Sequence, residues 1–270
     1  MSLALRTFAT THEASAALSQ DGARYLGGGT LLVRAVNEGD IATTGYVRTT
    51  DPALSDIEVS DQRVRIGAST TMSSIISSGD LATISGAAKA VGGPAIRNMA
   101  TVGGNLFAPA PYGDFTVALL ALGAMVHTTG GDMGIVDFLD RRDDFAKPSG
   151  KGAIVTAVSF DIPAANSFRF VKVSRVKPKG VSVLSIAAAI QADPQGEVSA
   201  ARIALGCMAD RPMRAMAAEK ALIGAPLTKA GIADAVAVIV AGTDPITDPV
   251  ASAWYRSEVL PVHFGRLLLG

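Results

Sequence analysis

Metal-binding residues are scarce in this sequence. Its 270 residues include one cysteine, Cys207, and three histidines, His12, His127 and His263, which stand far apart. A single cysteine cannot form an intramolecular disulfide, and an iron–sulfur cluster needs about four cysteine ligands. The histidines show no metal-ligand spacing, so we expect no zinc site either.

Net charge is also lacking. The sequence has 24 Lys and Arg residues and 24 Asp and Glu residues, and no basic stripe stands out. This balance argues against nucleic acid as a partner. The hydrophobic fraction of 49% is enough for a sizeable core and argues against disorder. A chain of this length predicts one or two domains.

Long apolar runs are absent as well. The longest, Val181–Ile190 and Ala235–Ala241, fall well short of the roughly 20 residues that cross a bilayer. The first residues, MSLALRTF, lack the charged and apolar regions of a secretory signal. We therefore expect a cytoplasmic protein.

Hydrophobic patterning predicts an α+β chain with a boundary near residues 163–167. Residues 23–33 predict a strand, a tight glycine turn and the start of a helix. Residues 95–115 are rich in turn-forming residues and predict a loop over most of their length, and the polar residues 140–152 predict a surface loop. Strands are expected at 63–68, 154–160, 168–174, 181–190 and 200–208, and helices at 70–78, 81–91, 115–122, 215–222 and 231–241.

Two glycine-rich segments carry the most chemical information. Residues 26–32 read LGGGTLL and residues 101–105 read TVGGN. Backbone N–H groups without neighbouring side chains can approach a diphosphate closely, and two such loops suit a diphosphate held from both sides. Each loop could also be an ordinary tight turn, and neither matches the GxGxxG fingerprint or the P-loop. The residues alone therefore indicate a nucleotide or anion site, with plain turns as the alternative.

The wider sequence around these loops resembles a known family. Residues 96–106, IRNMATVGGNL, followed by Ala110-Pro111 and Asp114, resemble the second flavin loop of the FAD-binding subunits of molybdenum hydroxylases. Residues 27–32 resemble the first flavin loop of that family, with Gly27 where alanine is usual. The resemblance continues through IGASTT at 66–71, FVKVSR at 170–175 and Tyr255-Arg256.

The resemblance implies a fold and domain boundaries. Residues 1–165 would form a vanillyl-alcohol-oxidase-type FAD-binding domain, with subdomains of about 1–60 and 61–165. Residues 166–270 would form the smaller C-terminal sheet-and-helix domain of these flavoproteins.

The resemblance also assigns residues to FAD. Two loops would hold the pyrophosphate and ribityl chain, Asp114 and Lys172 would lie near the flavin ring, and Val155 or Ile154 would pack against it. From the residues alone, Asp114 could instead cap the following helix, Lys172 could be a solvated strand lysine, and Val155 could be a core residue. The loop residues are Gly27, Gly28, Gly29, Thr30, Leu31, Leu32, Ala100, Thr101, Gly103, Gly104 and Asn105.

The function implied by the resemblance is electron transfer within a heterotrimeric complex of the xanthine dehydrogenase or carbon monoxide dehydrogenase type. A small partner subunit would carry [2Fe–2S] clusters and a large one would carry molybdopterin. This oxidoreductase subunit would pass electrons from the clusters to an external acceptor, and we expect no residue of it to act on the organic substrate. Two alternatives are a self-contained flavin oxidase or reductase, and a binding protein that has lost FAD. Bound yellow flavin would exclude the binding protein without FAD, and co-purifying subunits would exclude the self-contained flavin enzyme.

Overall fold

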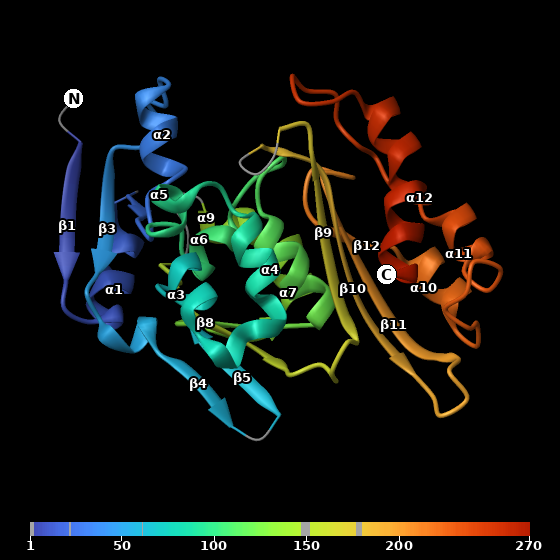
Figure 1. Ribbon diagram of the computed structural model, residues 1–270. Coiled ribbons are helices and arrows are strands. Elements are labelled where there is room, and N and C mark those ends of the chain that lie inside the picture. The colour runs from blue at the N-terminus through green and yellow to red at the C-terminus, as the bar shows by residue number, and fades with distance from the viewer. Residues whose placement is uncertain (1–2, 22, 61, 147–151, 177–179) are drawn as a thin grey trace. The chain divides into compact units, whose positions relative to one another are not determined.

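The computed structural model describes residues 3–21, 23–60, 62–146, 152–176 and 180–270 (Figure 1). These residues form two compact units, and the chain passes between them more than once. Unit 1 consists of Met1–Asp80, Pro94–Ala108 and Ala124–Asp161, and unit 2 consists of Leu81–Gly93, Pro109–Gly123 and Ile162–Gly270. The expected division into domains at residues 1–165 and 166–270 stays a prediction.

The first sheet of unit 1 has three parallel strands in the order β1-β3-β2. Helix α1 covers one face, where Ala14 and Leu18 pack against Val47 of the central strand. Helix α2 follows β2 after the first glycine loop. The elements are β1 (Ala4–Phe8), α1 (Thr11–Asp21), β2 (Arg24–Tyr25), α2 (Leu32–Asn37) and β3 (Gly45–Thr49).

The second sheet of unit 1 has five antiparallel strands in the order β4-β5-β8-β6-β7. Its strands alternate as a half-buried strand should: Val64 and Ile66 of β5 are buried, whereas Arg63 is exposed. The strands are β4 (Ile57–Ser60), β5 (Arg63–Gly67), β6 (Met125–Thr128), β7 (Gly131–Gly134) and β8 (Val155–Asp161). The short helices of this unit are η1 (Pro52–Ser55), α3 (Met72–Ser77), α5 (Pro94–Arg97), α6 (Val102–Leu106), α8 (Ile135–Asp140) and α9 (Arg142–Ala146).

Unit 2 is built on one antiparallel sheet in the order β12-β11-β10-β9, with helices on both faces (Figure 1). Helix α7 is buried along its whole length and packs on one face, where Val117 lies against Gly206. Leu184 and Ile186 point to the other face and pack with Leu260 and Phe264 of α12. The elements are η2 (Gly79–Leu81) at the unit boundary, α4 (Ala82–Ala90), α7 (Asp114–Leu122), β9 (Phe168–Ser174), β10 (Ser182–Ala192), β11 (Val198–Gly206), β12 (Met213–Arg214), α10 (Met216–Leu222), α11 (Ala233–Val238) and α12 (Ala253–Leu269).

The α+β class is confirmed, and a strand or helix lies wherever the pattern predicts one, but two loop predictions are wrong. Residues 95–115 contain α5, α6 and the start of α7. These helices begin beside Gly and Pro, which read as turn signals in the sequence. Residues 140–152 contain α9, while 147–151 lie outside the described residues. The pattern does not predict β1, α1, β3, β4, β6, β7, α8 or the C-terminal helix α12.

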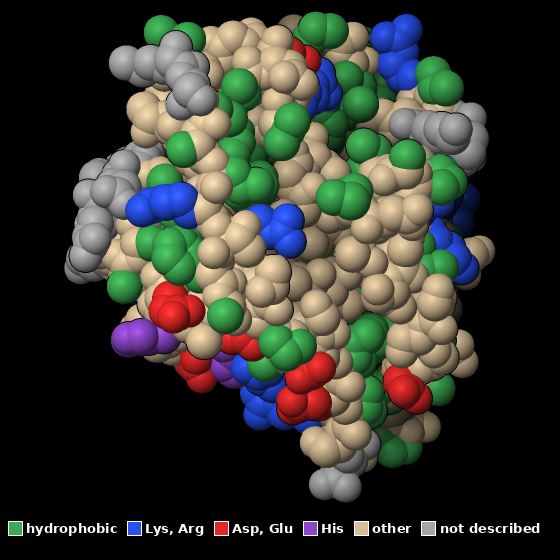
Figure 2. Space-filling model, turned by 90° about the vertical axis from the view of Figure 1, so that its left-hand side faces the viewer, with side chains coloured by type: hydrophobic (Ala, Val, Ile, Leu, Met, Phe, Trp, Pro, Cys, Tyr) green, Lys and Arg blue, Asp and Glu red, His purple; other side chains and the backbone are tan. Residues whose placement is uncertain are grey.

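Some large hydrophobic side chains of unit 1 are exposed. Ile41 is 91% exposed, and Leu5 and Val33 are also exposed. Figure 2 views the side that carries β1 and α2 and shows hydrophobic side chains spread over much of that face, between polar ones. Among the described residues, no helix is both long and apolar enough to cross a membrane.

Candidate functional site

The first glycine loop connects β2 to α2 in unit 1. Leu26 N–H donates to Val47 O at 2.8 Å, which ties the start of the loop to the central strand β3. Gly29 has φ +72°, in the left-handed region where glycine avoids the steric cost of a side chain. Val33 N–H then donates to Gly29 O at 3.0 Å, so the loop passes directly into the first turn of α2.

The same loop packs directly on the second glycine segment. A β-carbon built on Gly28 would lie 1.7 Å from Met99 O, and one built on Gly27 would lie 3.1 Å from Thr101 Oγ1. The backbone at Gly28 therefore touches the backbone of Met99, and only glycine allows this approach. Two segments about 70 residues apart in the sequence thus form one surface within unit 1.

The first loop carries unused hydrogen-bond donors. The backbone N–H groups of Gly27 to Leu31 have no hydrogen-bond acceptor among the described residues. Successive backbone N–H groups in a turn can form an anion-binding concavity. Gly28, Gly29 and Thr30 are half-buried, which limits competition from bulk water. A diphosphate fits the donor set that this loop presents.

The donors of the second segment are used within the protein. Gly103 N–H donates to Ala68 O at 2.8 Å, and Gly104 N–H donates to Thr101 Oγ1 at 3.1 Å. Thr101 is thus the N-cap of α6. The expectation that Gly103 and Gly104 offer free amides is therefore wrong. Gly103 is needed for packing instead, since its β-carbon would lie 3.0 Å from the β-carbon of Ala68.

Asn105 and Ala100 complete the second segment. Asn105 is buried, and its Nδ2 donates to Thr101 O at 3.1 Å, so part of its carboxamide holds the turn together. Ala100 N–H donates to Ile96 O at 2.7 Å, and Ala100 O accepts from Met72 N–H at 2.9 Å. Both residues therefore fix the shape of the surface on which the first loop rests.

The two candidates for packing against the ring differ in environment. Ile154 belongs to the core beneath α1, together with Ala14 and Val47. Val155 begins β8 and is also buried. The assignment of Val155 to the flavin stays a prediction.

Asp114 and Lys172 form a buried ion pair in unit 2. Lys172 Nζ on β9 lies 2.9 Å from Asp114 Oδ2 at the start of α7 and donates to Ala90 O at 2.8 Å. Ser182 Oγ donates to Asp114 Oδ1 at 2.6 Å. The N-cap of α7 is Gly113, with no side-chain capping bond. Asp114 is therefore not a helix cap, and Lys172, whose side chain is 13% exposed, is not a solvated strand lysine.

Sequence reasoning missed Ser182. It lies 68 residues beyond Asp114, and no motif around it predicts a carboxylate as its partner. The one cue in the sequence is its position as a polar residue at the head of an apolar strand. Such a residue needs a partner when the strand is buried.

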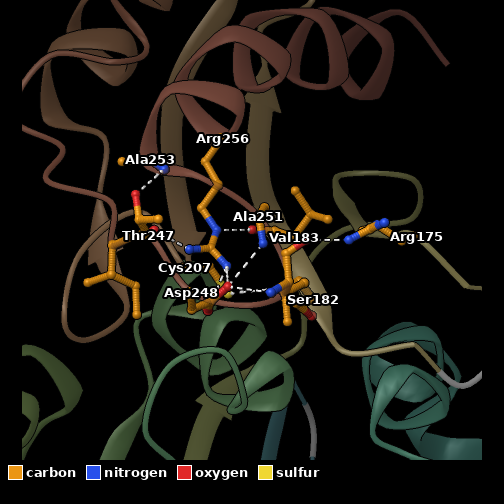
Figure 3. Close-up of polar contacts among 11 residues, drawn as sticks. Arg175, Ser182, Val183, Cys207, Thr247, Asp248, Ala251, Ala253 and Arg256 are labelled. Carbon is orange, nitrogen blue, oxygen red and sulfur yellow. Dashed lines mark hydrogen bonds and ion pairs between the residues drawn. The ribbon is translucent and has the colours of Figure 1, made fainter.

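A second buried ion pair fixes the same part of unit 2. Arg256 of α12 is fully buried, and its guanidinium binds both carboxylate oxygens of Asp248, at 3.0 and 2.9 Å (Figure 3). Its Nε donates to Val183 O at 2.8 Å. Burial opposes ionisation of Asp248, but the N–H groups of Ala251 and Val250 together with Arg256 outweigh it and lower the pKa of Asp248.

Cys207, the only cysteine in the sequence, lies beside these groups. Its Sγ is 3.7 Å from Ser182 O, to which it donates (Figure 3). Burial, and then the charge of Asp114, raise the pKa of the Cys207 thiol to about 12. The thiol is therefore protonated and unreactive at neutral pH. Among the described residues, no group of three or more His, Cys, Asp or Glu side chains is placed to hold a metal.

Comparison with known families identifies the chain. Residues 4–164 match the family described as "FAD binding domain in molybdopterin dehydrogenase", and residues 169–270 match the "CO dehydrogenase flavoprotein C-terminal domain". The chain belongs to the FAD-binding subunits of the molybdenum hydroxylase family. It is thus an oxidoreductase subunit, its cofactor is FAD, and the fold class expected from the resemblance is confirmed.

Individual relatives agree with this assignment. The chain is 31% identical to the 6-hydroxypseudooxynicotine dehydrogenase complex subunit alpha of Paenarthrobacter nicotinovorans, over 80% of this chain and 75% of the relative. It is 33% identical to the nicotinate dehydrogenase FAD-subunit of Eubacterium barkeri, over 65% of this chain and 62% of the relative. Carbon monoxide dehydrogenase from Hydrogenophaga pseudoflava has the same fold, with a TM-score of 0.89, 24% identity and coverage of 99% and 96%.

Proposed function

We propose that this chain is the electron-transfer subunit of a molybdenum hydroxylase complex. In this proposal it accepts electrons from [2Fe–2S] clusters on a small partner subunit and delivers them to an external acceptor, while a large molybdopterin subunit hydroxylates the organic substrate. The observation that carries the proposal is the contact of Gly28 with Met99, which joins two glycine segments, while the Gly27–Leu31 amides have no acceptor within the part of the chain that the structure describes. We expect the complex in the cytoplasm.

The loop residues of unit 1 would hold the diphosphate and ribityl chain. The free N–H groups of Gly27 to Leu31 would donate to the phosphate oxygens, and the hydroxyl of Thr30 would add a donor. Ala100, Thr101 and Asn105 would shape the surface on which this loop rests, since their own polar groups are largely engaged in the turn. Leu32 holds the end of the loop, because its carbonyl accepts from Tyr46 Oη at 3.1 Å.

The Asp114–Lys172 pair of unit 2 would lie at the flavin ring. FAD, when bound, supplies the redox chemistry that lets one protein accept electrons from clusters and release them to a different acceptor. An ammonium at the pyrimidine end favours negative charge on the reduced ring. The ammonium has three N–H donors, and Asp114 and Ala90 engage two of them. Among the described residues the third donor has no acceptor, and it would be available to the ring.

Exposed apolar side chains support docking of partner subunits. Trp254, Val262 and Leu269 of α12 are 70%, 49% and 47% exposed, and Ile41 of unit 1 is almost fully exposed. Subunit interfaces in obligate complexes are large and rich in such residues. The chain itself has one cysteine, so the cluster ligands of the proposed complex belong to another subunit.

The test separates cluster reduction from electron delivery. The native complex is compared with the same complex depleted of FAD, while cluster absorbance and reduction of the external acceptor are followed under anaerobic conditions. We expect substrate to reduce the clusters in both, but only the FAD-loaded complex to reduce the acceptor. Re-adding FAD should restore delivery. Unimpaired delivery without FAD would contradict the proposal.

A further inference from the structure

Both oxygens of the Asp114 carboxylate are engaged by side chains of unit 2. Ser182 Oγ donates to Oδ1 at 2.6 Å, and Lys172 Nζ lies 2.9 Å from Oδ2. Asp114 is only 5% exposed. A buried carboxylate is strongly destabilising unless its oxygens are paired, so the Ser182 bond is a required part of this arrangement.

An irregularity in β10 directs Ser182 towards Asp114. The pairing of β10 with β9 shifts between Ser182 and Leu184. Leu184 points into the core that contains α12, whereas Ser182 bonds to Asp114 of α7 on the other side of the sheet. In a regular strand, residues two apart point to the same face. The bulge therefore re-aims Ser182, as bulges beside functional sites often do.

Two side chains donate hydrogen bonds to the backbone carbonyls of Ser182 and Val183. The Cys207 thiol donates to Ser182 O, and Arg256 Nε donates to Val183 O at 2.8 Å (Figure 3). Arg256 is in turn fixed by its two bonds to Asp248. The Ser182 hydroxyl is thus delivered to Asp114 from a rigid anchor, and its burial excludes water as a substitute donor.

Lys172 depends on this carboxylate for its orientation. Its ammonium is placed by Asp114 Oδ2 and Ala90 O, and of the two, only Asp114 carries a charge. If the carboxylate rotates, the ammonium loses one of its two fixed contacts. A hydrogen bond to a charged group is worth more than one between neutral groups, so this contact is the stronger of the two.

We infer that Ser182 is a positioning residue for the flavin end of the site. Its hydroxyl fixes the Asp114 carboxylate, and the carboxylate orients the Lys172 ammonium towards the ring. The inference rests on the proposed position of the ring beside Lys172. It predicts that Ser182 affects the flavin through Asp114, to which its hydroxyl donates.

The experiment uses the full chain loaded with FAD and a matched control from the same strand. Ser182→Ala removes the donor, and Ser182→Thr keeps it. Ser185→Ala is the control, because Ser185 is equally buried on β10 but its Oγ has no hydrogen-bond partner among the described residues. Lys172→Met tests the position of the ring independently. The midpoint potential of bound FAD and the melting temperature of the protein are measured for each.

We expect Ser182→Ala to make the potential more negative, equivalent to about a tenfold loss of preference for reduced over oxidised FAD. Ser182→Thr and Ser185→Ala should both keep the midpoint potential of the wild-type protein. A lower melting temperature without a shift in potential would overturn the inference, provided Lys172→Met still lowers the potential. An unchanged potential in Lys172→Met would overturn both the inference and the proposed ring position. If Ser182→Ala does not fold, Ser182→Cys replaces it, because a thiol keeps the volume but is a weak donor.

Discussion

The carbonyl oxygen of Met99 lies 1.7 Å from the place where Gly28 would carry a β-carbon. This contact joins the two glycine segments of unit 1 and leaves no room for a side chain. At the neighbouring position, a β-carbon on Gly27 would lie 3.1 Å from Thr101 Oγ1, the end of a side chain that can move. Two adjacent glycines of one loop therefore tolerate substitution very differently.

Gly28→Ala should abolish FAD binding, whereas Gly27→Ala should change it little. The alanine methyl group at position 28 would force the first loop away from Met99 and disturb its row of free amides. Alanine at position 27 matches the residue usual in the family. FAD content per chain after gel filtration measures the difference. Gly86→Ala serves as the control, since its β-carbon would have no atom within 4 Å, and equal FAD content in all three variants would refute the role of this contact.

Gly104→Val should weaken FAD binding while the fold is largely kept. A β-carbon on Gly104 would lie 3.0 Å from Thr101 Oγ1, which is the acceptor that caps α6. A branched side chain must displace that hydroxyl and disturb the surface on which the first loop rests. Titration of the apo-protein with FAD gives the affinity, and circular dichroism checks the fold. Wild-type affinity would show that this turn does not face the cofactor.

How far the sequence predicts this site depends on the range of each interaction. The turn between β2 and α2 was predictable because Gly27, Gly28 and Gly29 carry that information locally, whereas its role in binding FAD stays a prediction. The buried state of Lys172 and the role of Ser182 were not predictable, because they depend on contacts between α7, β9 and β10 that meet only in the folded unit. Helix α6 escaped prediction for a similar reason: a segment reading VGGNL has poor helix propensity, and its cap at Thr101 and packing at Ala68 stabilise it instead.

Cys207 should be unreactive in the folded protein. With its thiol pKa raised to about 12, only about one thiol in 10⁴ is ionised at pH 8. A thiol reagent should modify the chain slowly in buffer and fully in denaturant. The unfolded thiol ionises above a pH of about 9 and the folded one does not. The free energy of unfolding should therefore fall as pH rises from about 9 to 12, more steeply than in Cys207→Ala. Rapid labelling of the native protein at pH 8 would contradict the buried placement.

Arg256→Leu should destabilise the protein far more than a typical surface substitution. It removes a fully buried guanidinium, so that Asp248 loses its charged partner and the Val183 carbonyl loses this donor. Loss of one partner of a buried pair costs about 3–5 kcal/mol, or on the order of 10 °C in melting temperature for a chain of this size. Arg141→Leu, at an exposed position, is the control. A melting temperature equal to that of the control would show that the pair is not formed.

The lowered pKa of Asp248 adds a pH dependence to the same region. Because the folded pKa lies below the unfolded one, the pair stabilises the protein fully above a pH of about 4, the pKa of an unperturbed aspartate. This stabilisation is lost as pH falls through the folded pKa. In Asp248→Asn, the free energy of unfolding should therefore fall less steeply as pH decreases into the acid range. If the free energy of unfolding depends on acid pH in the same way in the variant and the wild type, Asp248 does not form this stabilising ion pair.

The most direct test of the account is the composition of the native complex. The chain is isolated from its host under mild conditions, and flavin, iron and molybdenum are measured together with the proteins that accompany it. We predict about one FAD per chain, released from the protein by acid, together with one subunit carrying [2Fe–2S] clusters and one carrying molybdopterin. A lone yellow protein that oxidises an organic substrate with neither iron nor molybdenum present would contradict the account.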